Sequence, residues 1–225
     1  LCHRFRFRTL QHRLLKWFDE NHRIFPWRED RATKYQQIVS EILLQRTKAE
    51  TVAKYYDTFF SKFPDWNALA NASLEELEEI MKPLGLYRHR ARRLYKLGED
   101  IRRRGGRIPG DENELRDSGF IGLYVTNAFE LFILKNRKPL LDVNMSRLLK
   151  RYFKPGDFID VRHDKEIQEL ANDIIEVRRC KELNWAILDY AALVCKSRNP
   201  LCGECVLNRY CKYYELLKGY IPSLP

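Results

Sequence analysis

The sequence predicts an all-α protein, and three observations carry that prediction. Apolar residues recur with a helical period in nearly every segment between glycines and prolines, capping residues stand where several segments begin, and no alternating pattern is long enough for a strand. No internal repeat of fixed period occurs, which argues against a repeat architecture. The 225 residues, 44% of them hydrophobic, allow one large or two small domains with a sizeable core.

The first helices are indicated by their apolar spacing. Arginines alternate with phenylalanines over residues 4–8, a pattern that fits a basic arm or, more simply, a frayed terminus. From Leu10 the spacing predicts a helix that ends before the turn at Pro26. A second helix is predicted over residues 34–47, and its core face consists of Ile38, Val39, Ile42 and Leu43.

Capping and breaking signals mark the later helices. Ser73 and Glu76 form the signature of a capping box, and the helix that they open ends at Pro83. A long basic helix is predicted from about Arg88 to Arg104. Further helices are expected after Asp111, over about residues 124–135, after Asp142, over residues 164–177 and over residues 183–194.

Four cysteines form the most specific motif of the chain. Cys195, Cys202, Cys205 and Cys211 stand at the spacing C-x6-C-x2-C-x5-C. Two disulfide bridges within so short a segment would have little chain left to constrain, whereas four thiols suit a metal. On spacing alone, a structural zinc ion and an iron-sulfur cluster are about equally good interpretations.

The charge balance points to a polyanionic partner. The chain has 41 Lys and Arg against 31 Asp and Glu, and its formal charge of +10 favours phosphates, although membrane surfaces and acidic proteins would also be attracted. No run of apolar residues is long enough to span a bilayer. Cys2 and Cys180 fall outside the four-cysteine spacing and are expected to be free thiols in a reducing compartment.

The cysteine spacing resembles the cluster loop of the endonuclease III and MutY branch of the helix-hairpin-helix DNA glycosylases, the HhH-GPD superfamily. The resemblance extends over nearly the whole chain, from Phe25 to Cys211. It implies that the four cysteines hold a structural [4Fe-4S] cluster. It also implies that Lys196 and Arg198, between the first two cysteines, touch DNA phosphates; without it they belong to an ordinary solvated loop.

A second resemblance lies in residues 40–47, Ser-Glu-Ile-Leu-Leu-Gln-Arg-Thr, which match the glycosylase helix S-E-I-x-L-Q-x-T. This match implies that Glu41 faces the base pocket. It implies further that Gln45 and Arg46 enter the duplex and fill the gap left by an extruded nucleotide. From periodicity alone, Glu41 instead belongs to a solvated polar stripe with Gln37 and Gln45.

A helix, a hairpin and a second helix are predicted between residues 111 and 135, a unit that can direct backbone N–H groups at a phosphate. The family pattern for the hairpin is L-P-G-h-G. Gly122 matches its second glycine and Ile121 the residue before, whereas Phe120 stands in place of the first glycine and Gly119 precedes it. By the resemblance, Gly119, Ile121 and Gly122 contact DNA.

Tyr124 stands two residues after Gly122, where the bifunctional endonuclease III branch carries the lysine that forms a Schiff base. A tyrosine cannot attack the sugar in that way. The archaeal-type thymine mismatch glycosylases that the chain resembles have tyrosine at this position, whereas MutY has a small residue. The alternative from the residues alone is a tyrosine that packs in the core.

Asp142 belongs to a segment that resembles the family motif L-D-x-N, whose aspartate is catalytic. Taken alone, it is a helix cap, and both interpretations can hold together. Cleavage of the bond between base and deoxyribose builds positive charge on the sugar, so an ionised carboxylate near C1′ would stabilise the transition state. Glu41 is the candidate acid that assists the departing base.

The resemblance implies two domains. Residues 29–136 would form a six-helix barrel domain with the helix-hairpin-helix, and residues 1–28 with 137–225 would form the iron-sulfur cluster domain, with the active site in the cleft between them. We expect a monomer that acts on mismatched double-stranded DNA without a membrane partner. Its expected location is the cytoplasm of a prokaryote, in association with the nucleoid.

The predicted function is that of a monofunctional DNA glycosylase, which flips out and removes thymine or uracil opposite guanine. Adenine excision of the MutY type is the alternative, although the chain ends soon after the cysteines and lacks the C-terminal domain with which MutY recognises 8-oxoguanine. An alternative of another class is a non-catalytic DNA-binding iron-sulfur protein, suggested by Phe120 in the hairpin.

Overall fold

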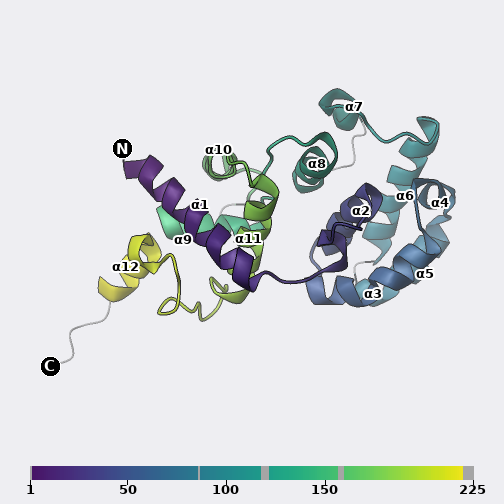
Figure 1. Cartoon of the computed structure of the whole chain (residues 1–225). Helices are drawn as coiled ribbons and strands as arrows, with labels where there is room; N and C mark the ends of the chain where they lie inside the picture. The colour runs from purple at the N-terminus through teal and green to yellow at the C-terminus, as the bar shows by residue number, and fades with distance from the viewer. Residues whose placement is uncertain (1, 86, 118–121, 157–159, 220–225) are drawn as a thin grey trace. The chain divides into compact units, whose positions relative to one another are not determined.

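The computed structural model in Figure 1 describes residues 2–85, 87–117, 122–156 and 160–219. All regular elements in these ranges are helical, so the predicted all-α class is confirmed. None of these helices combines the length and the apolar character needed to cross a lipid bilayer. The chain forms two compact units: unit 1 consists of Leu1–Arg23 with Arg137–Pro225, and unit 2 is Ile24–Asn136.

Unit 2 packs α2 against α3 and α8, and α6 against α4 and α5 (Figure 1). Its α-helices are α2 (Lys34–Leu44), α3 (Ala49–Lys62), α4 (Trp66–Asn71), α5 (Leu74–Met81), α6 (Tyr87–Arg103), α7 (Glu112–Asp117) and α8 (Leu123–Phe129). The remaining elements are the 3-10 turns η1 (Pro26–Arg28) and η2 (Lys82–Leu84), and the π-helical stretch η3 (Glu130–Leu134) that continues α8.

Two features of unit 2 fix its packing. The predicted core face of α2 is confirmed, because Ile38, Val39, Ile42 and Leu43 are all buried. The close approach of α6 to α4 depends on Gly98, where a Cβ atom would lie 2.8 Å from the carbonyl oxygen of Leu69. Since that oxygen belongs to the backbone, a larger residue would push the two helices apart.

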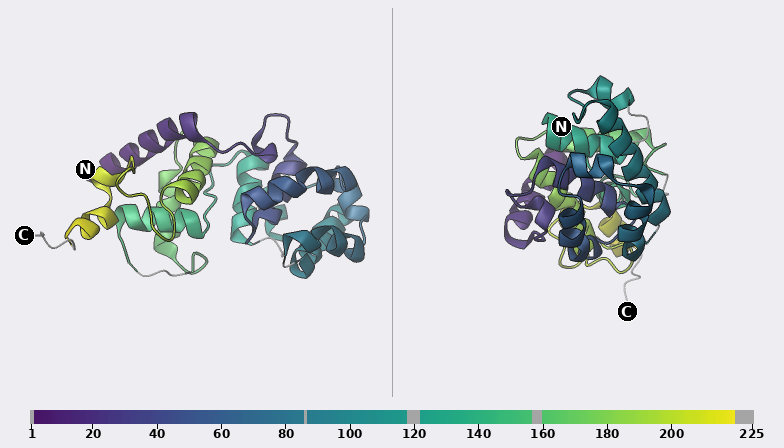
Figure 2. Two further views of the ribbon diagram at one scale, coloured as in Figure 1. Left: turned by 90° about the horizontal axis from the view of Figure 1, so that it is seen from below. Right: turned by 90° about the vertical axis from the view of Figure 1, so that its right-hand side faces the viewer.

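Unit 1 is arranged around α11, which packs against α1 and α9; Figure 2 shows α1 beside it. Trp17 of α1 meets the fully buried Tyr190 of α11 edge to face, with ring centroids 4.8 Å apart. The helices of this unit are α1 (Cys2–Asn21), α9 (Val143–Phe153), α10 (Lys165–Ile174), α11 (Cys180–Leu193), the 3-10 turn η4 (Asn208–Tyr210) and α12 (Lys212–Gly219).

The arginines near the N-terminus form neither an arm nor a frayed end, so that expectation is wrong. They lie on α1, which begins at Cys2 and not at Leu10. Arg6 donates through Nη2 to the carbonyl oxygens of Tyr152 and Tyr210, the second at 3.0 Å. These contacts with residues far along the chain hold the first turns of the helix, and helical spacing alone could not reveal them.

Capping residues open several helices as expected, while some helix ends differ. The capping box of α5 is confirmed, since the backbone N–H of Glu76 donates to Oγ of Ser73 at 3.1 Å and that of Ser73 donates to Glu76 at 3.0 Å. A further capping box, between Thr33 and Gln36, opens α2. The predicted helix over residues 34–47 is too long, because α2 ends at Leu44.

Asn184 of α11 fixes the segment that leads into α9, and its replacement tests this packing. Its Oδ1 accepts from the backbone N–H of Leu140 at 2.6 Å, and its Nδ2 donates to the carbonyl oxygens of Lys138 at 3.2 Å and Cys180 at 3.0 Å. Because Asn184 is fully buried, we expect Asn184→Ala to lower the free energy of unfolding by about 2–4 kcal/mol. Urea denaturation followed by circular dichroism measures the change.

The matched control is Asn172→Ala on the exposed face of α10, where Nδ2 also donates to a carbonyl oxygen one turn earlier. We expect this change to alter the free energy of unfolding by less than about 0.5 kcal/mol. Equal losses for the two variants would contradict the role of Asn184.

Candidate functional site

Glu41 and Tyr124 are neighbours in unit 2, on the packed helices α2 and α8. The hydroxyl of Tyr124 donates to Oε2 of Glu41 over 2.8 Å. Glu41 is only 3% exposed, so its assignment to a solvated polar stripe is wrong, and Tyr124 is half-buried. A buried carboxyl group that accepts a hydrogen bond from a phenol is held in one orientation, as proton transfer or hydrogen bonding to a ligand requires.

Gln45 and Arg46 lie in the turn that follows α2. Arg46 has a φ of 60°, a left-handed conformation that is uncommon for a residue with a side chain, and it is exposed. The carbonyl oxygen of Gln45 accepts a hydrogen bond from Arg90, and Oε1 of its side chain accepts one from Arg93. The turn therefore presents Arg46 to solvent and holds Gln45 by both its backbone and its side chain.

The predicted hairpin is described only at its edges. Gly119, Phe120 and Ile121 lie outside the described residues. Gly122 is exposed and extended, with φ −74° and ψ 163°, and it is the N-cap residue of α8. On the other side, the side chain of Asp111 caps α7, as predicted.

Asp142 is the N-cap residue of α9, which confirms that part of its interpretation. Its Oδ1 accepts from the backbone N–H groups of Asn144 and Met145, both at 2.8 Å, and its Oδ2 accepts from Nδ2 of Asn144 at 2.6 Å. Removal from water raises the pKa of the Asp142 carboxyl, while these hydrogen bonds and the charge of Arg147 oppose the rise. The carboxyl group is thus fixed in direction by three donors.

Arg147 connects this carboxyl group to the cysteine segment, and no sequence pattern indicates that role. Its Nη1 donates to Oδ1 of Asn144 at 3.0 Å, and its Nε donates to the carbonyl oxygen of Cys195 at 2.9 Å. Its Nη2 donates to the carbonyl oxygen of Ala191 at 2.8 Å. The only signal in the sequence is that Arg147 belongs to the helix that Asp142 opens.

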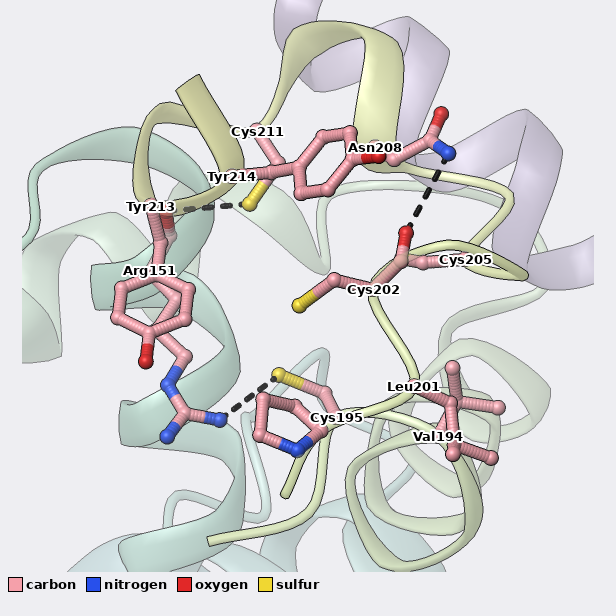
Figure 3. Close-up of a pocket in the computed structure, with 11 residues that line it drawn as sticks. Arg151, Val194, Cys195, Leu201, Cys202, Cys205, Asn208, Cys211, Tyr213 and Tyr214 are labelled. Atoms are coloured by element: carbon pink, nitrogen blue, oxygen red, sulfur yellow. Dashed lines mark hydrogen bonds between the residues drawn. The ribbon is translucent and has the colours of Figure 1, made fainter. Parts of the chain in front are cut away.

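The four cysteines of the motif line one pocket of unit 1 (Figure 3). The helix α11 leads into Cys195, and the other three cysteines lie between it and α12. The sulfur atoms of Cys195, Cys202 and Cys211 point into the pocket. It holds about 300 Å³ of space free of protein atoms, part of which is open to solvent.

Arg151 of α9 brings a positive charge to the edge of this pocket. Its Nη1 lies 3.6 Å from Sγ of Cys195 and donates to the carbonyl oxygen of Lys196 at 2.7 Å, while Nη2 donates to that of Ser197 at 3.1 Å. The backbone after Cys195 is therefore held from α9. The side chains of Lys196 and Arg198 remain exposed.

Tyr190 supports Cys205 from the core of unit 1. Its hydroxyl donates to Sγ of Cys205 at 3.2 Å and accepts from the backbone N–H of Val206 at 2.8 Å. Burial raises the pKa values of the Cys202, Cys205 and Cys211 thiols, that of Cys211 to about 11. These three thiols are thus protonated at neutral pH when they are free, and metal binding must release those protons.

The chemistry of this donor set fits an iron-sulfur cluster. Four thiols around one pocket are the ligands that such clusters take, and Arg151 offers a compensating positive charge. The thiols are arranged around the pocket rather than gathered at one point: in the described ranges no three His, Cys, Asp or Glu side chains are grouped closely enough to bind one metal ion.

Two family descriptions match the chain. Residues 39–188 match the HhH-GPD superfamily of base excision DNA repair proteins, and residues 195–211 match the iron-sulfur binding domain of endonuclease III. The class of protein is therefore a DNA glycosylase with an iron-sulfur binding motif. The chain belongs to the HhH-GPD superfamily, since the first match covers more than half of its length.

Curated relatives are similar to this chain over most of its length. A thymine-DNA glycosylase of Aeropyrum pernix is 34% identical over 215 residues, which cover 93% of this chain and 96% of the relative. A thymine/uracil-DNA glycosylase of Methanothermobacter thermautotrophicus is 31% identical over 204 residues, 90% of this chain and 91% of the relative. An adenine DNA glycosylase of Mus musculus is 31% identical over 94% of this chain, which spans 43% of that relative.

Solved structures share the fold. A thermostable thymine-DNA glycosylase superposes with a TM-score of 0.86 at 29% identity, over 96% of this chain and 100% of the other. A trapped endonuclease III–DNA covalent intermediate superposes with a TM-score of 0.77 at 20% identity, over 94% of this chain and 96% of the other. The helix-hairpin-helix glycosylase fold that the sequence predicts is therefore confirmed.

Removal of one pocket thiol tests the metal site. We expect Cys205→Ala to lower the iron bound per purified chain by about tenfold, because a cluster that loses one of four thiolate ligands is easily lost. Iron analysis and the visible absorption of the purified protein measure the change. Cys180→Ala is the matched control, since Cys180 is a buried cysteine outside the pocket lining, and it should retain wild-type iron. Equal iron in both variants, or zinc in place of iron, would contradict this assignment.

Proposed function

We propose that the protein is a monofunctional glycosylase that removes thymine or uracil mispaired with guanine. The hydrogen bond from Tyr124 to the buried Glu41 carries the proposal. It joins two residues that the family resemblance places in the active site: Glu41 faces the base pocket, and Tyr124 is a phenol where the lyase branch has its lysine. The full-length likeness to thymine and thymine/uracil glycosylases supports the choice of base.

Asp142 is the proposed catalytic carboxylate. As the bond between base and sugar breaks, positive charge develops on the deoxyribose, and a carboxylate in a fixed orientation stabilises that charge more than it stabilises the ground state. Both Oδ atoms of Asp142 already accept hydrogen bonds from the start of α9. Little reorientation is therefore required during the reaction. The same carboxylate can orient the attacking water molecule.

Glu41 and Tyr124 are proposed to act on the leaving base. A carboxyl group in a dry environment can hydrogen-bond to a pyrimidine carbonyl oxygen or nitrogen, or transfer a proton to it, as the base departs. Tyr124 fixes the direction of that carboxyl group through Oε2. Because a phenol cannot form a Schiff base with the sugar, we infer that the protein releases the base without cutting the strand.

We propose that residues of both units bind DNA and that each unit makes separate contacts with it. Gln45 and Arg46 would fill the gap that the flipped nucleotide leaves. Gly119, Ile121 and Gly122 would hold a phosphate by backbone N–H groups, as Lys196 and Arg198 would by charge. A mispair is easier to open than a matched pair, which contributes to selectivity for the mismatch.

The proposed cofactor is a [4Fe-4S] cluster held by Cys195, Cys202, Cys205 and Cys211. When bound, it would crosslink the segment between α11 and α12 and so fix the loop that carries Lys196 and Arg198. The protein's own contribution is the hydrogen bonding of that loop by Arg151. We further propose that the protein works as a monomer in the cytoplasm of a prokaryote, associated with the nucleoid.

Adenine excision is the second candidate, favoured by the likeness to adenine DNA glycosylases over 94% of this chain. Tyr124 argues against it, because the resemblance gives MutY a small residue there. A non-catalytic DNA-binding role is disfavoured by the paired Glu41 and by the three donors that orient Asp142.

A single-turnover assay tests the proposed activity. End-labelled duplexes with T·G, U·G, A·G and A·8-oxoguanine pairs are incubated with excess protein, then analysed with and without hot alkali. We expect breaks at the T·G or U·G site only after alkali, because hydrolysis leaves an abasic site. Asp142→Asn should slow excision by a factor of about 10³, because it removes the charge and keeps the shape.

The matched control is Asp65→Asn, which changes another aspartate at a helix N-cap, on the exposed start of α4. It should excise at the wild-type rate. Excision of adenine alone would favour the second candidate. Strand cutting without alkali would overturn the monofunctional assignment, and tight binding without any excision would favour a DNA-binding role.

The pH dependence of excision tests the charge state of Asp142. The active form is the carboxylate, and burial raises its pKa above the ordinary value near 3.8, so the rate should fall with decreasing pH at a higher pH than an exposed aspartate would give. Asn144→Ala removes a donor to the charged form, which should raise this pKa further and move the acid limb to higher pH. The neighbouring exposed Val143→Ala is the control and should leave the limb unchanged. If the acid limb of Asn144→Ala were the same as that of the wild type, the assignment of this limb to Asp142 would be contradicted.

A further inference from the structure

Arg90 of α6 is a buried arginine whose partners are backbone carbonyl groups. It is 4% exposed. Its Nη1 donates to the carbonyl oxygens of Leu84 at 2.8 Å and Gly85 at 2.9 Å, and its Nη2 donates to that of Gln45. Burial lowers the pKa of Arg90, and the charge of Arg93 lowers it further. A guanidinium in such surroundings is costly to bury, so its contacts need an explanation beyond core packing.

The three carbonyl groups belong to two turns with the same unusual feature. Arg46, after α2, has a φ of 60°, and Gly85, before α6, has a φ of 68°. In each turn Arg90 holds the carbonyl group of the residue directly before the left-handed one, Gln45 in the first and Leu84 in the second. A left-handed residue changes the orientation of the peptide group that precedes it. Arg90 therefore fixes each turn at the point where the chain changes direction.

The same turns carry exposed positive charge. Arg46 and Lys48 follow α2, Arg88 follows the second turn, and all three are exposed. Lys82, before the second turn, is paired with Glu79. Arg93, one turn after Arg90 on α6, donates to Oε1 of Gln45. Arg90 therefore joins two segments that are separate in the sequence and that each carry an exposed arginine, and Arg93 holds the side chain of Gln45.

We propose that Arg90 is a positioning residue that ties the turn at Gln45–Arg46 to the turn at Leu84–Gly85 and so keeps the first turn in the shape in which it enters DNA. The inference rests on the proposed function, which has Gln45 and Arg46 fill the gap left by the flipped nucleotide. A turn that is rigid before binding loses less conformational entropy when it inserts between bases. Arg90 itself is buried beneath the turns and acts on DNA through them.

The experiment measures insertion without base excision. The intact, metal-loaded protein is titrated into a duplex with a stable abasic analogue opposite guanine and 2-aminopurine as the neighbour of the analogue. Insertion of Gln45 next to 2-aminopurine changes its fluorescence, while fluorescence anisotropy of a labelled end reports binding alone. We expect Arg90→Met to bind the duplex within about threefold of wild type and to reduce the 2-aminopurine change about tenfold.

A double-mutant cycle separates positioning from general stability. Gln45→Ala should reduce the 2-aminopurine signal to a similar extent, and Arg90→Met should add little in the Gln45→Ala background, because both changes remove the same inserted turn. Arg90→Lys, which keeps the charge and one donor group, should recover part of the signal. Arg90→Lys also replaces Arg90→Met in the experiment if Arg90→Met does not fold, as judged by circular dichroism and iron content.

Arg102→Met is the matched control, an exposed arginine of α6 away from both turns, and it should behave as wild type. A folded Arg90→Met protein with a wild-type 2-aminopurine signal would overturn the inference, as would full additivity of Arg90→Met and Gln45→Ala. A wild-type protein that binds the duplex without any 2-aminopurine change would overturn it as well. If wild type gives the signal but excises no mispaired base, the proposed function fails while the inference stands.

Discussion

Hydrogen bonds from arginine side chains to loop carbonyl groups hold segments of this protein that contain its candidate functional residues. These segments lack a regular ladder of backbone hydrogen bonds, and each buried carbonyl group needs a donor from elsewhere. Arg147 and Arg151 supply donors from α9 to residues 195–197, and Arg90 supplies them to the two turns next to α6. A guanidinium suits this task because its five N–H groups form a rigid fork that can serve several acceptors at once.

Because arginines donate hydrogen bonds within the fold, the net charge of the chain serves two purposes. The formal charge of +10 indicates affinity for a polyanion. Part of it, however, is used within the fold, where the buried Arg90 and the half-buried Arg6 and Arg147 donate to backbone carbonyl oxygens. Lys196 and Arg198 are exposed and remain available for phosphate. The two uses are connected, because arginines that donate to carbonyl oxygens hold the loops that expose the basic side chains.

Local sequence signals were reliable where the structure itself is local. The core face of α2, the capping box at Ser73 and the cap at Asp142 each depend on residues within one or two turns of helix, so spacing was enough to predict them. The end of α2 and the start of α1 were predicted wrongly. Arg90 reaches across 45 residues to the carbonyl group of Gln45, and Arg6 reaches across 146 residues to that of Tyr152. Periodicity contains no information on such distant partners.

The sequence by itself determined the helical class, the four thiols at their specific spacing, and the identity of the candidate groups Glu41, Tyr124 and Asp142. Only the tertiary structure decided what surrounds them. It buried Glu41 against a hydroxyl group 83 residues away, and it joined the helix that Asp142 opens to Cys195 through Arg147. The physical reason is that a helical pattern shows which face of a helix turns inward, whereas the partner on that face depends on how distant helices pack.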